Sequence, residues 1–431
     1  MNLSFKKFDN KNGLTVCVVD NCAGAYISIA RRLAKSFSKS YYHSVNQNPF
    51  PKLSLSNIGT GYDDIERVDE FWNRLEEFDV IVFPDIYFND WGARLRKLGK
   101  VVWGGCESEI LETDRKVFKD ELNSAGLLVA PTEYIKGLTE LAKYLQGVED
   151  RWIKISYYRG NAETFHHIDW LHTKPWINEM AHTMGPMAEV LDFQVEDPIK
   201  AIAEIGCDGW SVNGNYPETM VWGIEIKDCG YIGKRCDYEV LPVPIKYVND
   251  KFRPVMNKYS HTGFYSNEIR YTENKESYYT DAAMRAGSPP SNTYLEMISN
   301  WDEIILNGGK GELVKPKFIA EYGVEIILKS NYCNEGFLNI SYPDEYKDNI
   351  KLKGCFKLND VEYIIPFTDA GFDMTEFGSV VVVGDNLEEI ISKALEIAGS
   401  VEGYKVEFNA AALPEAIERL NDIQNILGVK F

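Results

Sequence analysis

The first hundred residues alternate short apolar runs with stretches of helical period, and this alternation restricts the chain to few folds. Runs rich in β-branched residues predict strands at LTVCVVD (14–20), FDVIVFPD (78–85) and KVVWGG (100–105). AYISIARRLAKSF follows the first run and WGARLRKLG precedes the third, and both place apolar residues at helical spacing. Strands that alternate with helices pair in parallel, because each helix returns the chain across the sheet. Residues 1–105 are therefore expected to form a parallel α/β domain, with any ligand at the strand ends near Asp20 and 85–90.

The rest of the chain changes pattern twice. The segment 107–127 has helical spacing and ends at a glycine, and a second helix (TELAKYLQG) and a strand (RWIKIS) follow it. From about 189 to 285 the chain is predicted to form mainly strands, including YEVLPVPI (238–245), and the polar stretch 249–263 is expected to be a surface loop. The last region combines the strands VEIILKS, YIIPFT and GSVVVVG with the helix NLEEIISKALEIAGSV, which predicts an α+β domain.

These patterns predict a mixed α/β and α+β protein of several units. We divide the chain into residues 1–105, 106–185, 186–310 and 311–431. A unit of helices and strands followed by a mostly antiparallel one gives a two-lobed arrangement. A cleft between the two middle units is therefore the expected site.

The charge balance excludes one class of partner. The chain has 431 residues, with 65 Asp and Glu against 46 Lys and Arg, and its formal net charge is −19. A field of this sign repels phosphate backbones, so a protein that coats nucleic acid is excluded. A local basic pocket for one small phosphate group is still compatible with this composition.

Two further features concern the cellular compartment. No apolar run approaches the roughly 18 residues that span a bilayer, and MNLSFKKFDNKNG lacks the apolar stretch of a signal peptide. The eight cysteines are scattered and none stands in a C-x-x-C pair, which is typical of reduced, mostly buried thiols. We therefore expect a cytoplasmic protein without a membrane segment.

The familiar catalytic motifs are absent from this sequence. It contains no P-loop, no dinucleotide-binding glycine motif after a strand, no nucleophile elbow and no zinc-protease helix motif. His166, His167 and His172 are close in sequence, but no Cys or carboxylate stands beside them at ligand spacing. We interpret them as solvated loop histidines.

Spaced charged residues are the remaining candidates for chemistry. Arg115 lies on the predicted helix 107–127, and Lys154 lies in mid-strand, where a lysine is costly unless its ammonium reaches an anion. Glu196 ends the strand VLDFQVED, and Glu204 follows it eight residues later. The alternative is that Lys154 faces water from an edge strand and that both glutamates are ordinary surface carboxylates.

The segment SYYTDAAMRAGSPPSN adds a carboxylate and a guanidinium. Asp281 stands four residues before Arg285, ahead of a turn that Gly287 and two prolines force. A magnesium-bound triphosphate needs oxygen ligands for the metal and a cation for the transferred phosphoryl group. A structural salt bridge between the two side chains is the alternative.

Taken in order, these segments resemble the motifs of the ATP-grasp superfamily, and most closely those of the phosphoribosylamine–glycine ligase family. The likeness extends to the tail FGSVVVVGDNLEEIISKALEIAG and so covers nearly the whole chain. It implies an N-terminal pre-ATP-grasp α/β domain, two ATP-grasp lobes and a C-terminal α+β domain. The ATP ligands that it implies are Arg115, Lys154, Gly160 in the phosphate loop YYRGNAET, Glu196, Asp197 and Ile199 at adenine, and Glu204 at ribose.

The closing motif YTDAAMRAGSPP supplies the implied metal and catalytic residues. Asp281 falls at the first Mg²⁺ ligand and Arg285 at the catalytic arginine. Ala283 stands where the family has an asparagine ligand, so we expect Glu268 in the preceding strand to provide the second metal contact. The phosphate loop has a single glycine, and the opening loop DNCAGAY lacks the Gly-Gly-Arg-Glu-His run of the family.

The implied activity is ATP-dependent joining of a small-molecule carboxylate to an amine. The carboxylate attacks the γ-phosphoryl group to give an acyl phosphate and ADP, and the amine then displaces phosphate to give an amide. Two alternatives remain open, namely a ligase that acts on a different amine acceptor and a catalytically silent nucleotide-binding or structural protein. The sequence does not indicate an oligomeric state.

Overall fold

The computed structural model describes residues 13–45, 53–155, 164–371, 374–428 and 431. Its first unit is a five-stranded sheet in the order β3-β2-β1-β4-β5, in which every neighbouring pair is parallel. The strands are β1 Thr15–Asp20, β2 Lys39–Ser44, β3 Glu66–Arg67, β4 Val80–Val82 and β5 Val101–Trp103. The helices are α1 Ile27–Leu33, α2 Leu53–Asn57 and α3 Asn89–Lys97, with a 3-10 segment at Phe71–Glu77. The predicted parallel α/β unit is confirmed.

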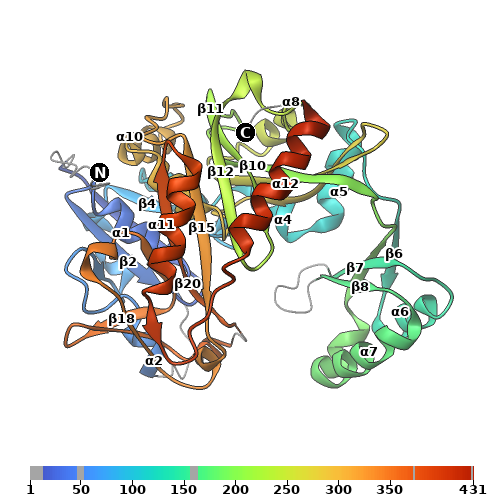
Figure 1. Cartoon of the computed structure of the whole chain (residues 1–431), viewed down its shortest axis with the longest axis horizontal. Coiled ribbons are helices and arrows are strands. Elements are labelled where there is room, and N and C mark those ends of the chain that lie inside the picture. Colours follow the sequence, from blue (N-terminus) through green and yellow to red (C-terminus); the bar gives the residue numbers. More distant parts are fainter. Residues whose placement is uncertain (1–12, 46–52, 156–163, 372–373, 429–430) are drawn as a thin grey trace.

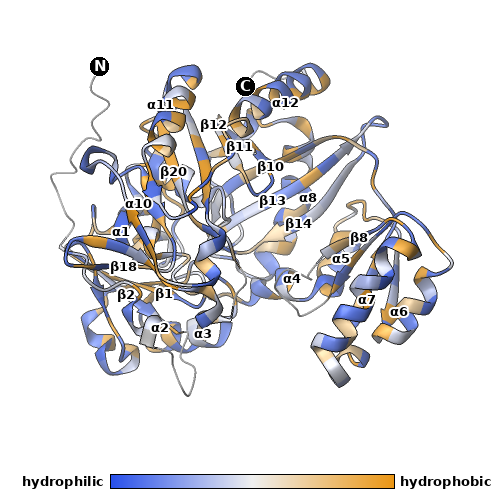
Figure 2. Ribbon diagram, turned by 60° about the horizontal axis from the view of Figure 1, so that its bottom comes forward, coloured by the Kyte–Doolittle hydropathy of each residue, from blue (hydrophilic) through white to orange (hydrophobic). Residues whose placement is uncertain are grey.

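The second unit is a small lobe with a sheet of its own. Its strands pair antiparallel in the order β6-β9-β7-β8, and Figure 1 shows this lobe extending away from the body of the molecule. The strands are β6 Thr132–Lys136, β7 Arg151–Ile155, β8 Thr164–His167 and β9 Asp192–Glu196, and the helices are α6 Leu138–Leu145 and α7 Trp170–Met184. Before them come α4 Ile110–Thr113 and α5 Arg115–Ser124. Both α6 and α7 carry a hydrophobic side and a hydrophilic side (Figure 2), as expected of helices that cover one face of a sheet.

The largest element is an eight-stranded sheet in the order β14-β13-β10-β11-β12-β15-β20-β17. Its strands are β10 Ala201–Ser211, β11 Thr219–Ile226, β12 Gly230–Asp237, β13 Gly263–Thr272, β14 Ser277–Ala283, β15 Tyr322–Lys329, β17 Ile350–Leu352 and β20 Glu376–Gly384. The helices of this part are α8 Val243–Lys258, α9 Ser291–Met297, α10 Trp301–Gly308, α11 Leu387–Gly399 and α12 Ala412–Leu427. A small sheet, β18-β19-β16-β21, completes the fold with Cys355–Leu358, Val361–Ile364, Leu338–Ser341 and Glu402–Gly403.

This large sheet crosses one of the predicted domain boundaries. Strands β12 and β15 pair directly, so the regions before and after residue 310 share one sheet. The small sheet of the lobe likewise takes β9 from beyond residue 185. The division of the chain into four units remains a prediction.

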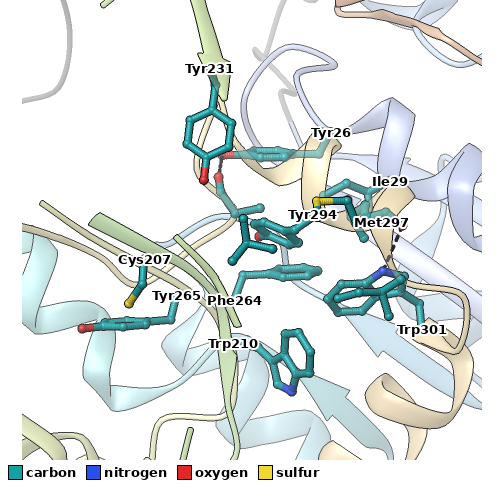
Figure 3. Packing of buried hydrophobic residues seen from close by; sticks show 14 of the residues in the cluster. Tyr26, Ile29, Cys207, Trp210, Tyr231, Phe264, Tyr265, Tyr294, Met297 and Trp301 are labelled. Atoms are coloured by element: carbon teal, nitrogen blue, oxygen red, sulfur yellow. Dashed lines mark hydrogen bonds between the residues drawn. The ribbon is translucent and has the colours of Figure 1, made fainter. Parts of the chain in front are cut away.

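The body and the small lobe have separate hydrophobic cores. The lobe packs Leu141, Ile153 and Phe193 around its sheet. In the body, Figure 3 shows Tyr26 of the first unit close to an aromatic group that includes Phe264 and Trp301. The first unit and the large sheet therefore share one core, whereas the lobe has a core of its own.

Two predicted elements are wrong. The stretch 249–263 was expected to be a loop, but α8 runs to Lys258 and buries Phe252 and Met256. The segment 238–245 was expected to be a strand, but it forms a 3-10 turn and the start of α8. Its prolines suit the first turn of a helix, where the backbone N–H groups need no partner within the helix.

No helix in the described part of the chain has both the length and the apolar character needed to cross a membrane. All eight cysteines are free thiols, and five of them are buried, as expected.

Candidate functional site

A cavity of about 480 Å³ lies where the small lobe meets helix α5 and strand β14. Five of the predicted site residues line it, namely Arg115, Lys154, Glu196, Ile199 and Asp281. Its apolar walls come from Leu111, Phe118, Leu122, Val129, Ala130 and Tyr279. Segments far apart in the sequence thus meet at one place, as the predicted cleft requires.

One carboxylate and two ammonium groups form the charged centre of this cavity. Lys119 Nζ lies 2.7 Å from Glu196 Oε1, and Lys154 Nζ lies 3.3 Å from Glu196 Oε2. Lys119 also donates to Thr132 Oγ1, and Lys154 donates to the backbone carbonyl of Thr280 at 3.4 Å. The alternatives of a water-facing Lys154 and a surface Glu196 are therefore wrong, because both side chains are largely buried.

Burial and charge act against each other in this group. Burial favours the neutral form of Glu196, but Lys154 and Lys119 together hold its pKa below the ordinary value. Burial lowers the pKa of Lys119, and Glu196 offsets only part of this effect. In this charged centre, the charged form of each group is therefore stabilised by its oppositely charged neighbour.

Helix α5 positions the two cations that come from the body. Its first residue is Arg115, and the side chain of Asp114 caps the helix by accepting from the backbone N–H groups of Lys116 and Val117. Lys119 follows Arg115 by four residues, so both side chains lie on the same face of the helix. This i, i+4 spacing was the signal by which Lys119 could have been found from the sequence.

A second cavity of about 820 Å³ adjoins the first, and Asp281 lines both. The other predicted residues on its wall are Glu204, Glu268 and Arg285, and Ala283 lies there too. The second cavity is the more acidic, and its lining carboxylates are Glu204, Asp208, Glu225, Glu268 and Asp281.

The crowding of carboxylates shifts their titration. Glu225 is exposed to solvent in this cavity, and the protein around it, with the neighbouring charges of Glu268 and Asp208, raises its pKa. Burial also raises the pKa of Asp208 to about 7, although its carboxylate accepts a hydrogen bond from Tyr231 Oη at 2.5 Å. Asp281 is exposed on the cavity wall, where Glu268 adds negative charge beside it and Arg115 and Lys154 add positive charge. A bound cation would relieve this repulsion.

Arg285 is held by acidic residues from two other parts of the chain. Its Nε lies 2.7 Å from Glu112 Oε1 of α4 and 3.8 Å from Asp85 Oδ1, just beyond β4. Glu112 also accepts the backbone N–H of Met284 at 2.8 Å, so it fixes both the side chain and its backbone. The alternative of a structural salt bridge between Asp281 and Arg285 does not match this arrangement, in which Glu112 is the close partner. Nothing in the sequence near Glu112 indicated this role.

The predicted metal ligands lie on adjacent strands. Glu268 of β13 and Asp281 of β14 are directly opposite each other in the antiparallel register. Their carboxylate oxygens are the donors that Mg²⁺ prefers, and its remaining positions are normally filled by water and phosphate oxygens. Among the described residues, no three His, Cys, Asp or Glu side chains are arranged as a complete metal site. The donor chemistry of these two carboxylates fits a magnesium ion.

Other predicted residues lie nearer the edge of the site. Glu204 pairs with Arg270 at 3.2 Å, and its side chain is 55% exposed. Asp197 pairs with Arg151 at 3.1 Å, and it is absent from the lining of both cavities. Gly160 lies outside the described residues.

The three neighbouring histidines have ordinary partners. His166 and His172 contact Asp150 and Asp169, and His167 is buried. His167 was expected to be a solvated loop residue, and this expectation is wrong because β8 places it inside the lobe, where its ring bonds to Thr173 Oγ1. The side chains point to separate partners and do not converge on a common point.

Comparison with known proteins identifies this architecture. No protein-family model matches the sequence, and no curated protein matches it in sequence. Among solved structures, phosphoribosylamine–glycine ligase from Thermotoga maritima has 15% identity and a TM-score of 0.67, over 92% of this chain and 99% of that chain. Biotin carboxylase from Campylobacter jejuni has 12% identity and a TM-score of 0.62, over 93% of this chain and 98% of that chain. L-amino acid ligase from Bacillus licheniformis has 13% identity and a TM-score of 0.57, over 93% of this chain and 100% of that chain. All three are ATP-grasp enzymes, and this chain has the ATP-grasp fold.

Proposed function

We propose that this protein is an ATP-dependent carboxylate–amine ligase that uses Mg²⁺. The observation that supports the proposal most directly is the convergence of Arg115, Lys154, Glu196 and Asp281 on one cavity, next to Arg285 in the adjoining cavity. The structural neighbours include complexes with an ATP compound or ADP, and one of them contains magnesium. Binding of ATP with Mg²⁺ fits a site that has cations at one end and paired carboxylates at the other.

In this proposal different residues bind different parts of the ATP molecule. Arg115 and Lys154 neutralise the α- and β-phosphates, and Ile199 and the backbone beside Glu196 and Asp197 hold the adenine. Glu204 at the edge of the second cavity binds the ribose, and Gly160 belongs to the loop that covers the phosphates. Glu268 and Asp281 would hold Mg²⁺, which would supply positive charge to neutralise the phosphates.

Arg285 is the proposed catalytic residue. Its guanidinium, oriented by Glu112, stabilises the charge that develops on the transferred phosphoryl group and on the acyl phosphate. The reaction needs no protein nucleophile, because the substrate carboxylate attacks the γ-phosphorus and releases ADP. The amine then attacks the acyl carbon and releases phosphate. Catalysis therefore consists of positioning and charge neutralisation.

A direct test is calorimetric titration with ATP and Mg²⁺, followed by a screen for ADP release with amino acids, each with and without phosphoribosylamine. We expect micromolar to millimolar binding of ATP and ADP release that depends on one carboxylate and one amine. Arg285→Ala should lower turnover by about two to three orders of magnitude. If ATP binds but no combination of carboxylate and amine gives turnover, the result would favour a catalytically silent nucleotide-binding protein. Ala283 is the observation that motivates this alternative. Failure to bind ATP would contradict the proposal itself.

One observation favours an acceptor other than phosphoribosylamine. The loop after β1, residues 20–26, contains no lysine or arginine to meet a phosphate. The Asp20 carboxylate accepts from the backbone N–H groups of Cys22 and Tyr26 and from Tyr42 Oη. The carboxylate of this loop therefore already has hydrogen-bond partners within the protein. In the screen we expect turnover with an amine that lacks a phosphate group.

A further inference from the structure

Gln194 is a buried amide without hydrogen bonds in the wall of the first cavity. It lies on β9, two residues before Glu196, and is 1% exposed. Neither its Nε2 nor its Oε1 has a hydrogen-bond partner among the described residues. A buried polar group that lacks its hydrogen bonds destabilises a protein, and here both ends of one amide lack them. Such a side chain indicates a ligand that supplies both a donor and an acceptor.

The surroundings of Gln194 define the shape of that ligand. In the sheet register Gln194 stands between Tyr134 of β6 and Lys154 of β7, so the three side chains lie on the same face. The rest of the cavity wall combines charged residues with an apolar group that includes Leu111, Phe118, Leu122, Val129 and Tyr279. Apolar side chains and one unpaired amide in the same wall suit a flat heteroaromatic ring whose edge carries a donor next to an acceptor.

We propose that Gln194 recognises the adenine base of the bound nucleotide and determines its specificity. The amide oxygen accepts from the 6-amino group, and the amide nitrogen donates to an adjacent ring nitrogen, which is the pairing that glutamine makes with adenine elsewhere. Guanine presents two acceptors along the equivalent O6 and N7 edge, so it leaves the amide oxygen without a donor. This inference rests on the proposed function, because it takes the cavity to be the nucleotide site.

The test compares nucleotides that differ only at the edge that Gln194 would contact. Dissociation constants are measured by calorimetry for Mg²⁺ complexes of ATP, GTP and purine riboside triphosphate, which lacks the 6-amino group. The wild-type protein should bind ATP about tenfold or more tightly than the other two. In Gln194→Met, which replaces the amide by an apolar group of similar length, the three affinities should agree within about threefold. The control Gln146→Met changes an exposed glutamine at the end of α6 and should keep the wild-type order.

A second measurement separates base recognition from a purely structural role. Removal of an unpaired buried amide should leave the unfolding temperature of the ligand-free protein unchanged or raise it, whereas removal of a structural amide lowers it. The proposal is overturned if wild type binds ATP but does not discriminate, if Gln194→Met keeps the discrimination, or if this variant is clearly less stable without nucleotide. If wild type binds none of the three nucleotides, the proposed function fails and this inference fails with it.

Discussion

The ion pairs of Glu196 give the sharpest prediction about stability. In Glu196→Gln the side chain keeps its size but loses its charge, and an NH2 donor replaces one of the two acceptor oxygens. Glu196 is 6% exposed, and the two lysines that it contacts are also largely shielded from water. The variant therefore leaves two ammonium groups close together in a poorly solvated cavity. We expect it to fold with a reduced free energy of unfolding.

The distances set the size of the effect. At an effective dielectric constant of about 20, the contacts of 2.7 Å and 3.3 Å correspond to about 6 and about 5 kcal/mol of Coulomb attraction. Desolvation of the three charges consumes most of this energy, and removal of one partner from a buried pair costs about 3 to 5 kcal/mol. Lys119 keeps Thr132 Oγ1 as an acceptor, which favours the lower end. The expected loss for Glu196→Gln is therefore about 3 kcal/mol.

Urea denaturation of wild type and variant measures this loss, and Glu133→Gln on the exposed face of β6 serves as the control with the same chemistry. The double variant Lys119→Met with Glu196→Gln completes the cycle. Because the two side chains interact directly, the combined loss should fall short of the sum of the single losses by about 1.5 kcal/mol or more. A loss below about 1 kcal/mol for Glu196→Gln, or strict additivity, would refute the reasoning.

Three further predictions follow from the same site. Glu112→Gln should lower kcat about tenfold with little change in the KM for ATP, because Arg285 loses the carboxylate that orients it. Steady-state kinetics of ADP release measures both constants, and an unchanged kcat would contradict this prediction. Asp208 has a folded-state pKa of about 7 against an ordinary value of 3.8, so the folded protein binds the proton more strongly and this stabilisation declines as pH rises from about 4 to about 7. In urea denaturation at pH 5 and pH 8, wild type should therefore lose more stability than Asp208→Asn, and equal losses would show that Asp208 does not titrate in this window. The net charge of −19 repels ATP at long range, so stopped-flow association of ATP should accelerate as salt screens that repulsion, whereas a rate that falls with salt would indicate that the local cations of the cavity dominate.

The sequence predicted those parts of the fold that depend on local pattern. The strands of the first unit are short apolar runs, and the parallel sheet follows from their alternation with helices. Helix α8 was missed because its polar residues obscure the period, although Val248, Phe252, Val255 and Met256 repeat at helical spacing on its buried face. The pairing of β12 with β15 joins residues about ninety positions apart, and no local pattern encodes such a contact.

The candidate site shows the same limit. Charged residues in apolar surroundings, such as Lys154, are visible in the sequence because their burial is costly without a partner. The partner itself is not visible, since Glu112 and Arg285 are 173 residues apart and meet only through the fold. Gln194 gave no signal either, because an amide in a strand is unremarkable until the structure shows that it is buried and unpaired.

The ion pairs at Glu196 also link the two parts of the molecule. Glu196 ends β9 of the small lobe, whereas Lys119 lies on α5, whose Phe118 and Leu122 belong to the core of the body. The contact between Lys119 and Glu196 therefore crosses from one core to the other, as does the bond from Lys154 to Thr280. An anion that engages either lysine must compete with Glu196 or with the carbonyl of Thr280. Because these groups are among those that join the lobe to the body, we expect binding of an anion in the cavity to be coupled to the position of the lobe.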